Sequence, residues 1–450
     1  MTECITDPID FASVSRKKIQ ADFNGGRLTS DAGTLLLREV DRYLGLIDQL
    51  NDCIPDPRNP AWVVHQQRTL LAQRIFGLAL GYEDLNDHHT LRDDPLFQTI
   101  TERGRWDDRS LASPPTLCRL ENRITRESLV RMARVFVEQF IASYRQTPPE
   151  ELILDFDATD DRVYGHQVGR FFHGYYDHYC FLPLYVFCGD QLLVSYLRTS
   201  QIDAAPPSRA ILKLLVTRFR QVWPQVRIIF RGDSGFCRWR LMRWCDRHEV
   251  GYVIGLAQNA VLLRKAERWT TRAQERFEQT GEKQRLFSAF RYAAQTWDRP
   301  RRVIVKAERL CEGPNTRFVV TTLAELPQVL YDKVYCQRGE MENRIKEQPL
   351  YLYADRTSCH EFPANQFRLL LSSAAYVLVE ALRRIGLKET ALAQAQVHTI
   401  RLRLFKVAAR VCSSVRRIVF HFCSRYPWQA LFRQVAHRLR RCPRPCLEFR

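Results

Sequence analysis

Two aspartates follow short apolar stretches that have the composition of buried strands. Asp157 lies in ELILDFDATDD (151–161), and Asp233 follows the apolar run of RIIFRGDSGF (227–236). A strand that ends in an acid places negative charge beside a rigid core, and paired carboxylates suit a hard divalent cation. Asp155 points to the same side of its strand as Asp157. We select Asp157 because it lies nearer the strand end, and we expect Asp160 and Asp161 to be solvated loop charges.

A third acid is expected on a helix further along the chain. In VYCQRGEMENRIKEQ (334–348), Tyr335, Arg338 and Glu342 are spaced so that they share one helical face. Glu342 would complete a metal site, Arg338 would pair with phosphate oxygens, and Tyr335 would donate to a phosphate or stack on a nucleotide. A lone Asp in such stretches more often caps a turn. Both strand-end acids together with this helix favour two Mg²⁺ ions, which support in-line displacement at phosphorus and for which Mn²⁺ can substitute.

The elements around these acids follow a recognisable order. Residues 149–257 predict three meandering strands, a helix, a strand, a helix and a strand. This is the order of a ribonuclease-H-like α/β core, in which the first and fourth strands are neighbours. Three strand-like runs in 258–330 predict an antiparallel β-insertion, and 331–388 returns to the core with the third acid.

The flanking regions predict DNA contacts. Residues 1–148 are expected to form a helical DNA-binding domain, in which a helix that starts at Pro114 would present Arg119, Arg123 and Arg126 to a DNA groove or simply to solvent. The pair His88-His89 is interpreted as part of a polar loop rather than as a metal site. Residues 389–450 form a basic C-terminal region with two short strands, RLRLFKVAARV and VRRIVFHF, and a basic helix.

Composition supports a polyanionic partner. The 450 residues include 68 Lys and Arg against 50 Asp and Glu, a net charge of +18, which favours nucleic acid through steering and counterion release. The 14 cysteines include no CxxC pair, as expected for reduced thiols in a cytosolic protein. The sequence contains no signal-peptide core and no stretch long enough to span a membrane. We therefore expect a soluble, cytoplasmic protein without a membrane partner.

These motifs together resemble the DDE transposases of bacterial insertion sequences, in particular the cut-and-paste branch with a β-insertion and a Tyr-Arg-Glu signature. The resemblance rests on LDFDATDD, FRGDSGF and YCQRGEMENRIKEQ, and extends to GHQVGRFFHGYYDHYCFLPLYVFCG and LASPPTLCRLENRI. It implies a Mg²⁺-dependent endonuclease that binds the terminal inverted repeats of its transposable element. It also implies a homodimer in the synaptic complex, joining of the freed 3′-OH to double-stranded target DNA, and a nucleoid-associated location in a bacterial cytoplasm.

The branch implies two further residues. Its cleaved end often passes through a DNA hairpin in which an aromatic of the β-insertion holds a flipped base; Trp269 and Trp297 are the candidates, and we favour Trp297. The signature also places a Lys seven residues after the Glu, where this chain has Pro349. Lys346 either takes that role in DNA binding or pairs with Glu342 on the surface.

The sequence leaves three alternatives to a transposase. The first is a structure-selective DNA nuclease of the same fold that lacks strand transfer. The second is a DNA-binding protein whose catalytic core has decayed, against which the three intact acids argue. The third is a zinc protein that uses His437, Cys442 and Cys446, which the loose spacing disfavours.

Overall fold

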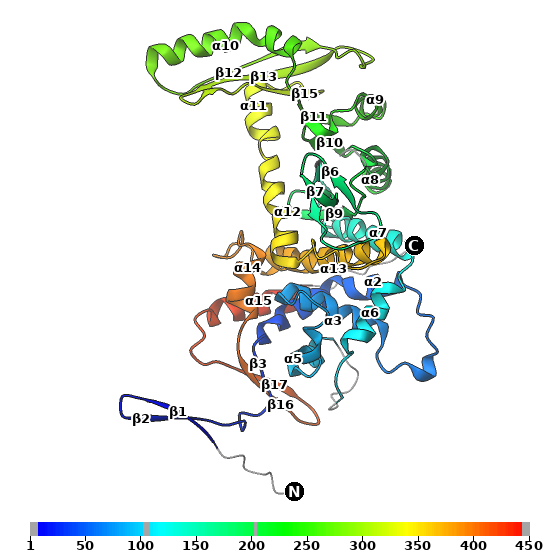
Figure 1. Ribbon diagram of the computed structural model, residues 1–450, viewed down its shortest axis with the longest axis vertical. Coiled ribbons are helices and arrows are strands. Elements are labelled where there is room, and N and C mark those ends of the chain that lie inside the picture. The colour runs from blue at the N-terminus through cyan, green and yellow to red at the C-terminus, as the bar shows by residue number, and fades with distance from the viewer. Residues whose placement is uncertain (1–7, 102–108, 202–204, 443–450) are drawn as a thin grey trace. The chain divides into compact units, whose positions relative to one another are not determined.

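The computed structural model describes residues 8–101, 109–201 and 205–442 (Figure 1). The described residues form two compact units, one of 8–121 with 378–442 and the other of 122–377. This division differs from the boundaries expected at 148 and 389, because the N-terminal and C-terminal segments fold together. Strand β16 (Ala409–Ser413) pairs with β3 (Leu28–Thr29), a contact between chain ends that composition does not reveal.

A large mixed sheet forms the centre of the second unit. Its strand order is β12 (Gln284–Tyr292), β13 (Arg301–Leu310), β15 (Arg317–Thr321), β11 (Gly251–Leu256), β10 (Arg227–Gly232), β4 (Glu151–Ala158), β8 (Leu184–Cys188) and β9 (Gln191–Tyr196). Strands β4 and β11 each pair in parallel with β10, and β4 pairs antiparallel with β8. The strands and helices predicted for 149–257 are present as β4 (Glu151–Ala158), β8 (Leu184–Cys188), β9 (Gln191–Tyr196), α8 (Ser208–Val222), β10 (Arg227–Gly232), α9 (Trp239–Arg247) and β11 (Gly251–Leu256). The first and fourth predicted strands are therefore neighbours, as expected.

The connection from β4 to β8 contains a small sheet that the sequence did not predict. Strand β7 (His178–Phe181) lies between β5 (Asp161–Arg162) and β6 (Phe171–His173). The sequence favoured one long hairpin arm here, because the whole segment is rich in aromatic and apolar residues. Three short strands form instead, and the first begins after Thr159 and Asp160, which follow the end of β4.

The insertion is not purely β-structure. Its first part, before the three predicted strand-like runs, forms the 21-residue helix α10 (Ala260–Thr280), which packs along the hairpin of β12 (Gln284–Tyr292) and β13 (Arg301–Leu310) (Figure 1). Asn259 caps the helix by accepting from the N–H of Leu262 at 2.9 Å. Strand β15 (Arg317–Thr321) pairs with both β13 and β11, so the insertion extends the central sheet.

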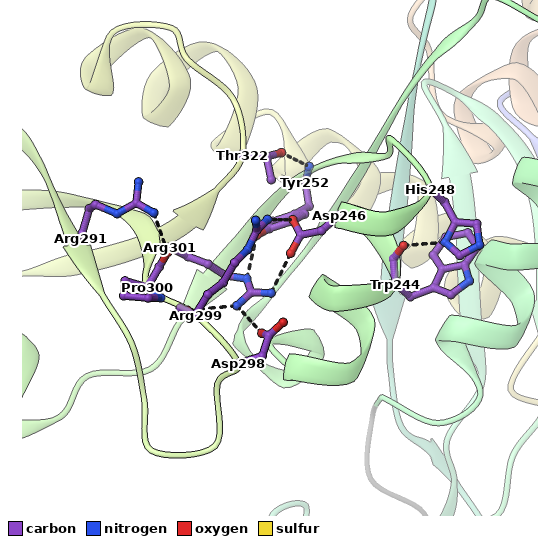
Figure 2. Close-up of polar contacts among 10 residues, drawn as sticks. All are labelled: Trp244, Asp246, His248, Tyr252, Arg291, Asp298, Arg299, Pro300, Arg301 and Thr322. Carbon is purple, nitrogen blue, oxygen red and sulfur yellow. Dashed lines mark hydrogen bonds and ion pairs between the residues drawn. The ribbon is translucent and has the colours of Figure 1, made fainter.

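A buried arginine joins the insertion to the core (Figure 2). The side chain of Arg301, at the start of β13, is only 2% exposed and pairs with Asp246 of α9 at 2.7 Å and with Asp298 at 2.8 Å. Its Nε also donates to the hydroxyl of Tyr252 on β11 at 3.0 Å. A fully buried guanidinium is tolerated only when its donors are satisfied, and here they fix the turn between β12 and β13 against the core.

The third acid lies on a composite helix. The short α11 (Pro327–Val329) leads into a π-helical turn (Leu330–Tyr335) and then into α12 (Arg338–Leu352), which contacts β4. Pro349, which replaces the Lys of the expected signature, lies within α12. Helix α13 (Phe362–Ala381) follows, as its apolar sequence predicted.

The first unit is helical with a small three-stranded sheet of β3, β16 and β17 (Ile418–Phe422). An exposed hairpin of β1 (Ile9–Val14) and β2 (Lys17–Ala21) precedes it. The basic helix α15 (Gln429–Arg441) forms as predicted and packs on α1 (Leu35–Leu44). The other helices of this unit include α2 (Leu46–Asp52), α3 (Gln67–Leu80), α4 (His88–Leu91), α5 (Pro95–Ile100) and α6 (Pro114–Asn122).

Two expectations about the flanking regions were wrong. The first half of RLRLFKVAARV forms a π-helical turn (Arg401–Phe405) rather than a strand, and its apolar side chains Leu404 and Phe405 are buried. The predicted helix with three arginines is interrupted: α6 ends before Arg123, and Arg126 begins α7 (Arg126–Ser143). Thr125 caps α7 by accepting from the N–H of Ser128, which ends any continuous arginine face. Within the described residues, none of the helices has the length and apolar character that a membrane crossing requires.

Candidate active site

The two strand-end aspartates lie side by side. Gly232 of β10 is the register partner of Phe156 of β4. The next residues of the two chains, Asp233 and Asp157, therefore lie at the same level of the sheet. Asp157 accepts from the N–H of Ala158 at 2.9 Å, and Asp233 accepts from the N–H of Gly235 at 2.8 Å and caps a short 3-10 turn. These local bonds fix one oxygen of each carboxylate and leave the other for a further partner.

Arg338 links the first acid to the third. Its guanidinium donates to Oδ2 of Asp157 at 3.0 Å and, through the other terminal nitrogen, to Oε1 of Glu342 one turn along α12. The side chain of Glu342 is 42% exposed, whereas those of Asp157 and Arg338 are largely buried. The helix face predicted from the spacing thus points at the sheet edge, although Arg338 contacts the acids themselves.

The electrostatics of Asp157 reflect this crowding. Burial raises the pKa of Asp157 to about 6, Arg338 opposes the rise, and the negative charges of Asp233 and Glu342 add to it. Three acids that influence one another in this way carry an electrostatic cost that a cation removes. Their hard carboxylate oxygens fit a divalent ion such as Mg²⁺. Among the residues that the structure describes, no three metal-ligating side chains are grouped closely enough to hold an ion, and the guanidinium of Arg338 supplies the positive charge between Asp157 and Glu342.

Tyr335 reaches the same edge of the sheet over a glycine. A Cβ atom at Gly255 would lie 2.6 Å from the Tyr335 hydroxyl and 3.0 Å from the backbone nitrogen of Ser234. Only a residue without a side chain therefore lets Tyr335 lie against the segment that follows Asp233. Burial raises the pKa of Tyr335, and the charge of Asp233 contributes to the rise. Sequence reasoning missed Gly255, although a glycine inside a strand often marks a close approach of this kind.

Asp155 has a structural partner. Nη2 of Arg231 donates to its Oδ2 at 2.6 Å, and Nε of Arg231 donates to its Oδ1. Both side chains are buried, and a third nitrogen of Arg231 donates to the carbonyl of Val334, directly before Tyr335. Sequence reasoning missed Arg231, whose signal was a charged residue within the apolar strand RIIFRG. The pair leaves Asp157, not Asp155, to face Arg338.

The two acids that follow β4 were expected to be solvated, which is wrong for Asp161. Asp160 pairs with Nε2 of His178 at 2.9 Å, whereas Asp161 is only 2% exposed. Burial raises the pKa of Asp161 well above its ordinary value, and the nearby charges of Asp355 and Asp160 add to the rise. Asp161 therefore lies in the small sheet, at the start of β5, and Asp160 is joined to that sheet through His178.

The predicted DNA-contacting residues lie in several places. Lys346 is exposed on α12, and no ion pair joins it to Glu342 within the described ranges. Trp297 packs edge-on against Tyr292, with their ring centroids 5.4 Å apart, and the Arg301 guanidinium lies over its ring. Trp269, the other candidate, stacks on Phe290. Both tryptophans are therefore packed against the core.

The remaining candidates are in the first unit or at its edge. Arg119 is exposed on α6, and Arg123 is half-buried just beyond that helix. Of the residues weighed for zinc, His437 lies on α15 and Cys442 directly follows it, while Cys446 is outside the described residues. The structure thus brings together Asp157, Asp233, Tyr335, Arg338 and Glu342.

Comparison with known proteins identifies the family. The protein-family model described as "Transposase DDE domain group 1" matches residues 11–444. No curated protein matches the chain. A cryo-EM structure of a piggyBac transposase synaptic complex with hairpin DNA is similar at 11% identity, covering 84% of this chain and 80% of that one, with a TM-score of 0.42. Because the family model spans nearly the whole chain, including both strand-end aspartates and Glu342, this protein belongs to the DDE transposase domain group 1 family.

Proposed function

We propose that the protein is the transposase of a bacterial insertion sequence, and that Asp157, Asp233 and Glu342 hold two divalent metal ions, Mg²⁺ or Mn²⁺. The observation that carries the proposal is the placement of two aspartates on neighbouring strand ends, joined to Glu342 through Arg338. The ions, when bound, supply an activated water or 3′-OH and stabilise the charge that develops on the phosphate. The strand order supports a ribonuclease-H-like core.

The residues around the acids have distinct roles in this proposal. With a cation held by Asp157 and Glu342, the Arg338 guanidinium would be free to pair with non-bridging phosphate oxygens, for which its planar fork is suited. Tyr335 lies beside Ser234 because Gly255 leaves space for its side chain. Its hydroxyl donates a hydrogen bond to the phosphate next to Asp233. The buried pair of Asp155 and Arg231 positions both strands and takes no part in the chemistry.

The proposed partners are the terminal inverted repeats and a double-stranded target. The net charge of +18 supports a DNA partner, and exposed Arg119 on α6 with nearby Arg123 supports a contact with the ends. Two copies would pair the two ends as a homodimer, in the nucleoid of a bacterial cell. Lys346, exposed one turn after Glu342, would contact the DNA backbone.

The proposal is tested by strand cleavage on DNA that carries the element ends. Asp157→Asn, Asp233→Asn and Glu342→Gln should each abolish Mg²⁺-dependent cleavage and retain end binding. Glu361→Gln, which changes an exposed carboxylate of the same unit, should cleave like the unmodified protein. Cleavage at the normal rate by any one of the three variants would refute the site.

A second assay separates transposase from nuclease. Pre-cut ends with a free 3′-OH are mixed with a target plasmid, Mg²⁺ and the protein. Joined products establish strand transfer, whereas cutting without joining establishes a structure-selective nuclease. End binding without either product would identify a protein whose catalytic core has decayed.

A further inference from the structure

The small sheet that follows Asp157 presents a group of exposed aromatic side chains. Tyr175 is 85% exposed and Tyr164 is 82% exposed, and Phe172 and Tyr179 are also well exposed. Large aromatic side chains normally bury most of their surface, because each removes a large apolar area from water. Four exposed rings on one short segment are therefore a feature that the catalytic acids do not explain.

The segment is fixed closely behind the catalytic acid. Only Ala158, Thr159 and Asp160 separate Asp157 from β5, and Asp160 is held by His178 of β7 at 2.9 Å. Strand β5 pairs with β7, and β7 pairs with β6. The negative charges of Asp160 and Asp157 contribute to raising the pKa of Tyr176, between β6 and β7, to about 12, although burial is the largest cause.

Anchors on the other side of the segment also limit its motion. The N–H of Val168 donates to the carbonyl of His360 at 3.0 Å, and the Ser200 hydroxyl donates to the carbonyl of Phe171 at 2.7 Å. Buried Asp161 lies at the start of β5. The exposed rings are thus carried by a framework that is hydrogen-bonded on several sides.

Arginines are interleaved with the rings. The guanidinium of Arg170 lies 4.5 Å from the centroid of Tyr179, and that of Arg162 lies 5.1 Å from the centroid of Tyr164. Phe172 and Tyr179 form a cross-strand pair with their ring centroids 5.7 Å apart. Rings that accept nucleobases by stacking, next to arginines that pair with phosphates, are the features of surfaces that bind single-stranded nucleic acid.

We propose that Tyr164, Phe172, Tyr175 and Tyr179, on and around the β5–β7–β6 sheet, bind unpaired nucleobases of the DNA strand that enters the site at Asp157. This inference rests on the proposed function and assigns it a partner in a particular form, a DNA end with unstacked bases. Trp297, the favoured candidate for holding a flipped base, and Trp269, the other candidate, are packed against the core. Stacking is tolerant of sequence, so the surface accepts any base.

Fluorescence and binding measurements test the proposal. They are made with Ca²⁺ in place of Mg²⁺, so that DNA binding is measured without cleavage. The probes are a blunt duplex and the same duplex with a single-stranded thymine tail that contains 2-aminopurine. The protein should bind the tailed DNA more tightly and quench the fluorophore. Tyr175→Ala and Phe172→Ala should each weaken binding of the tailed DNA by about tenfold, remove the quenching, and change binding of the blunt duplex by less than about twofold.

Two control variants make the result specific. Tyr175→Phe keeps the ring and should restore quenching, whereas Tyr196→Ala, which removes an exposed tyrosine at the end of β9, should have no effect. Unchanged quenching in both alanine variants would overturn the proposal. Equal weakening of binding to the tailed and the blunt DNA would also overturn it, in favour of a general DNA-binding surface. Loss of self-association of the protein in the absence of DNA would overturn it in favour of a protein-binding surface. If the protein does not cleave DNA but its quenching of 2-aminopurine still depends on the aromatic rings, only the catalytic proposal is refuted.

Discussion

The guanidinium of Arg231 donates to both carboxylate oxygens of Asp155, its register partner across β10 and β4. The same guanidinium donates to the carbonyl of Val334, so one buried side chain joins the two strands and the helical segment that carry the candidate acids. Buried charges are tolerated when they are paired and hydrogen-bonded. The pair therefore ties β10 to β4 and to the segment before Tyr335, next to the candidate acids.

Removing Arg231 should destabilise the protein. Arg231→Met leaves the carboxylate of Asp155 buried and unpaired, which costs about 3–5 kcal/mol, and the double variant Arg231→Met with Asp155→Leu should recover much of that loss. Urea denaturation measures both effects. Mn²⁺ binding, followed by electron paramagnetic resonance, should persist in the double variant and disappear in Asp157→Asn. Loss of Mn²⁺ binding in the double variant, with stability intact, would instead assign Asp155 to the metal site.

Metal binding should depend on pH in the acidic range. Because burial and neighbouring acids raise the pKa of Asp157 to about 6, protons compete with a metal ion below that value. Mn²⁺ affinity measured by calorimetry should be nearly constant from about pH 7 to 8 and should fall by up to about tenfold per unit below pH 6. An affinity that does not change down to about pH 4.5 would show that Asp157 does not bind the ion.

Much of the site could be predicted because short-range patterns determine it. Short apolar runs before Asp157 and Asp233 define the strand ends, and helical spacing places Arg338 and Glu342 on one face. The sequence did not indicate which residue pairs with each charged side chain of the site. The carboxylates that face Arg338 and the buried pair of Asp155 with Arg231 depend on strand register, which forms only when distant segments meet.

The fold outside the core was harder to predict for related reasons. Helix α10 was missed because its many charged residues obscure a narrow apolar stripe of Leu262, Ala266 and Ala273. The pairing of β16 with β3 joins segments near opposite ends of the chain, and no local pattern encodes it. His88 was expected in a polar loop, yet it is fully buried in α4, where Nε2 of Gln73 and Nη1 of Arg74 lie 3.2 and 3.4 Å from its two ring nitrogens.

His88 should make the first unit sensitive to acid. Burial and the nearby charge of Arg74 lower its pKa to about 3, from an ordinary value of 6.5. Between these values the unfolded chain binds a proton that the folded chain does not, so stability falls by up to about 1.4 kcal/mol per pH unit as pH decreases below 6.5. Hydrogen exchange of the backbone amides of α3 and α4, followed as a function of pH, measures this stability. His88→Gln should flatten this dependence, whereas His89→Gln, which changes an exposed neighbour, should keep it; equal slopes in both variants would contradict the assignment.

The space over Gly255 should be essential for activity because Tyr335 fills it. In Gly255→Ala the new Cβ would lie 2.6 Å from the Tyr335 hydroxyl, so the ring must move away from Ser234. We expect loss of cleavage by at least about tenfold, with end binding retained, since the site is displaced rather than unfolded. Gly251→Ala is a matched control on the same strand, where the nearest atoms to a new Cβ are 3.1 Å away and belong to side chains.

A second substitution distinguishes a steric cause from a chemical one. Tyr335→Phe removes the atom nearest the new Cβ, so the double variant of Gly255→Ala with Tyr335→Phe should be more stable than Gly255→Ala alone. It should remain as inactive as Tyr335→Phe, because the hydroxyl that would donate to the phosphate is missing. Thermal denaturation and single-turnover cleavage separate the two effects. If Tyr335→Phe cleaves at the normal rate, the hydroxyl has no role in the chemistry, and Gly255 serves only to let the helix of Tyr335 pack against the sheet.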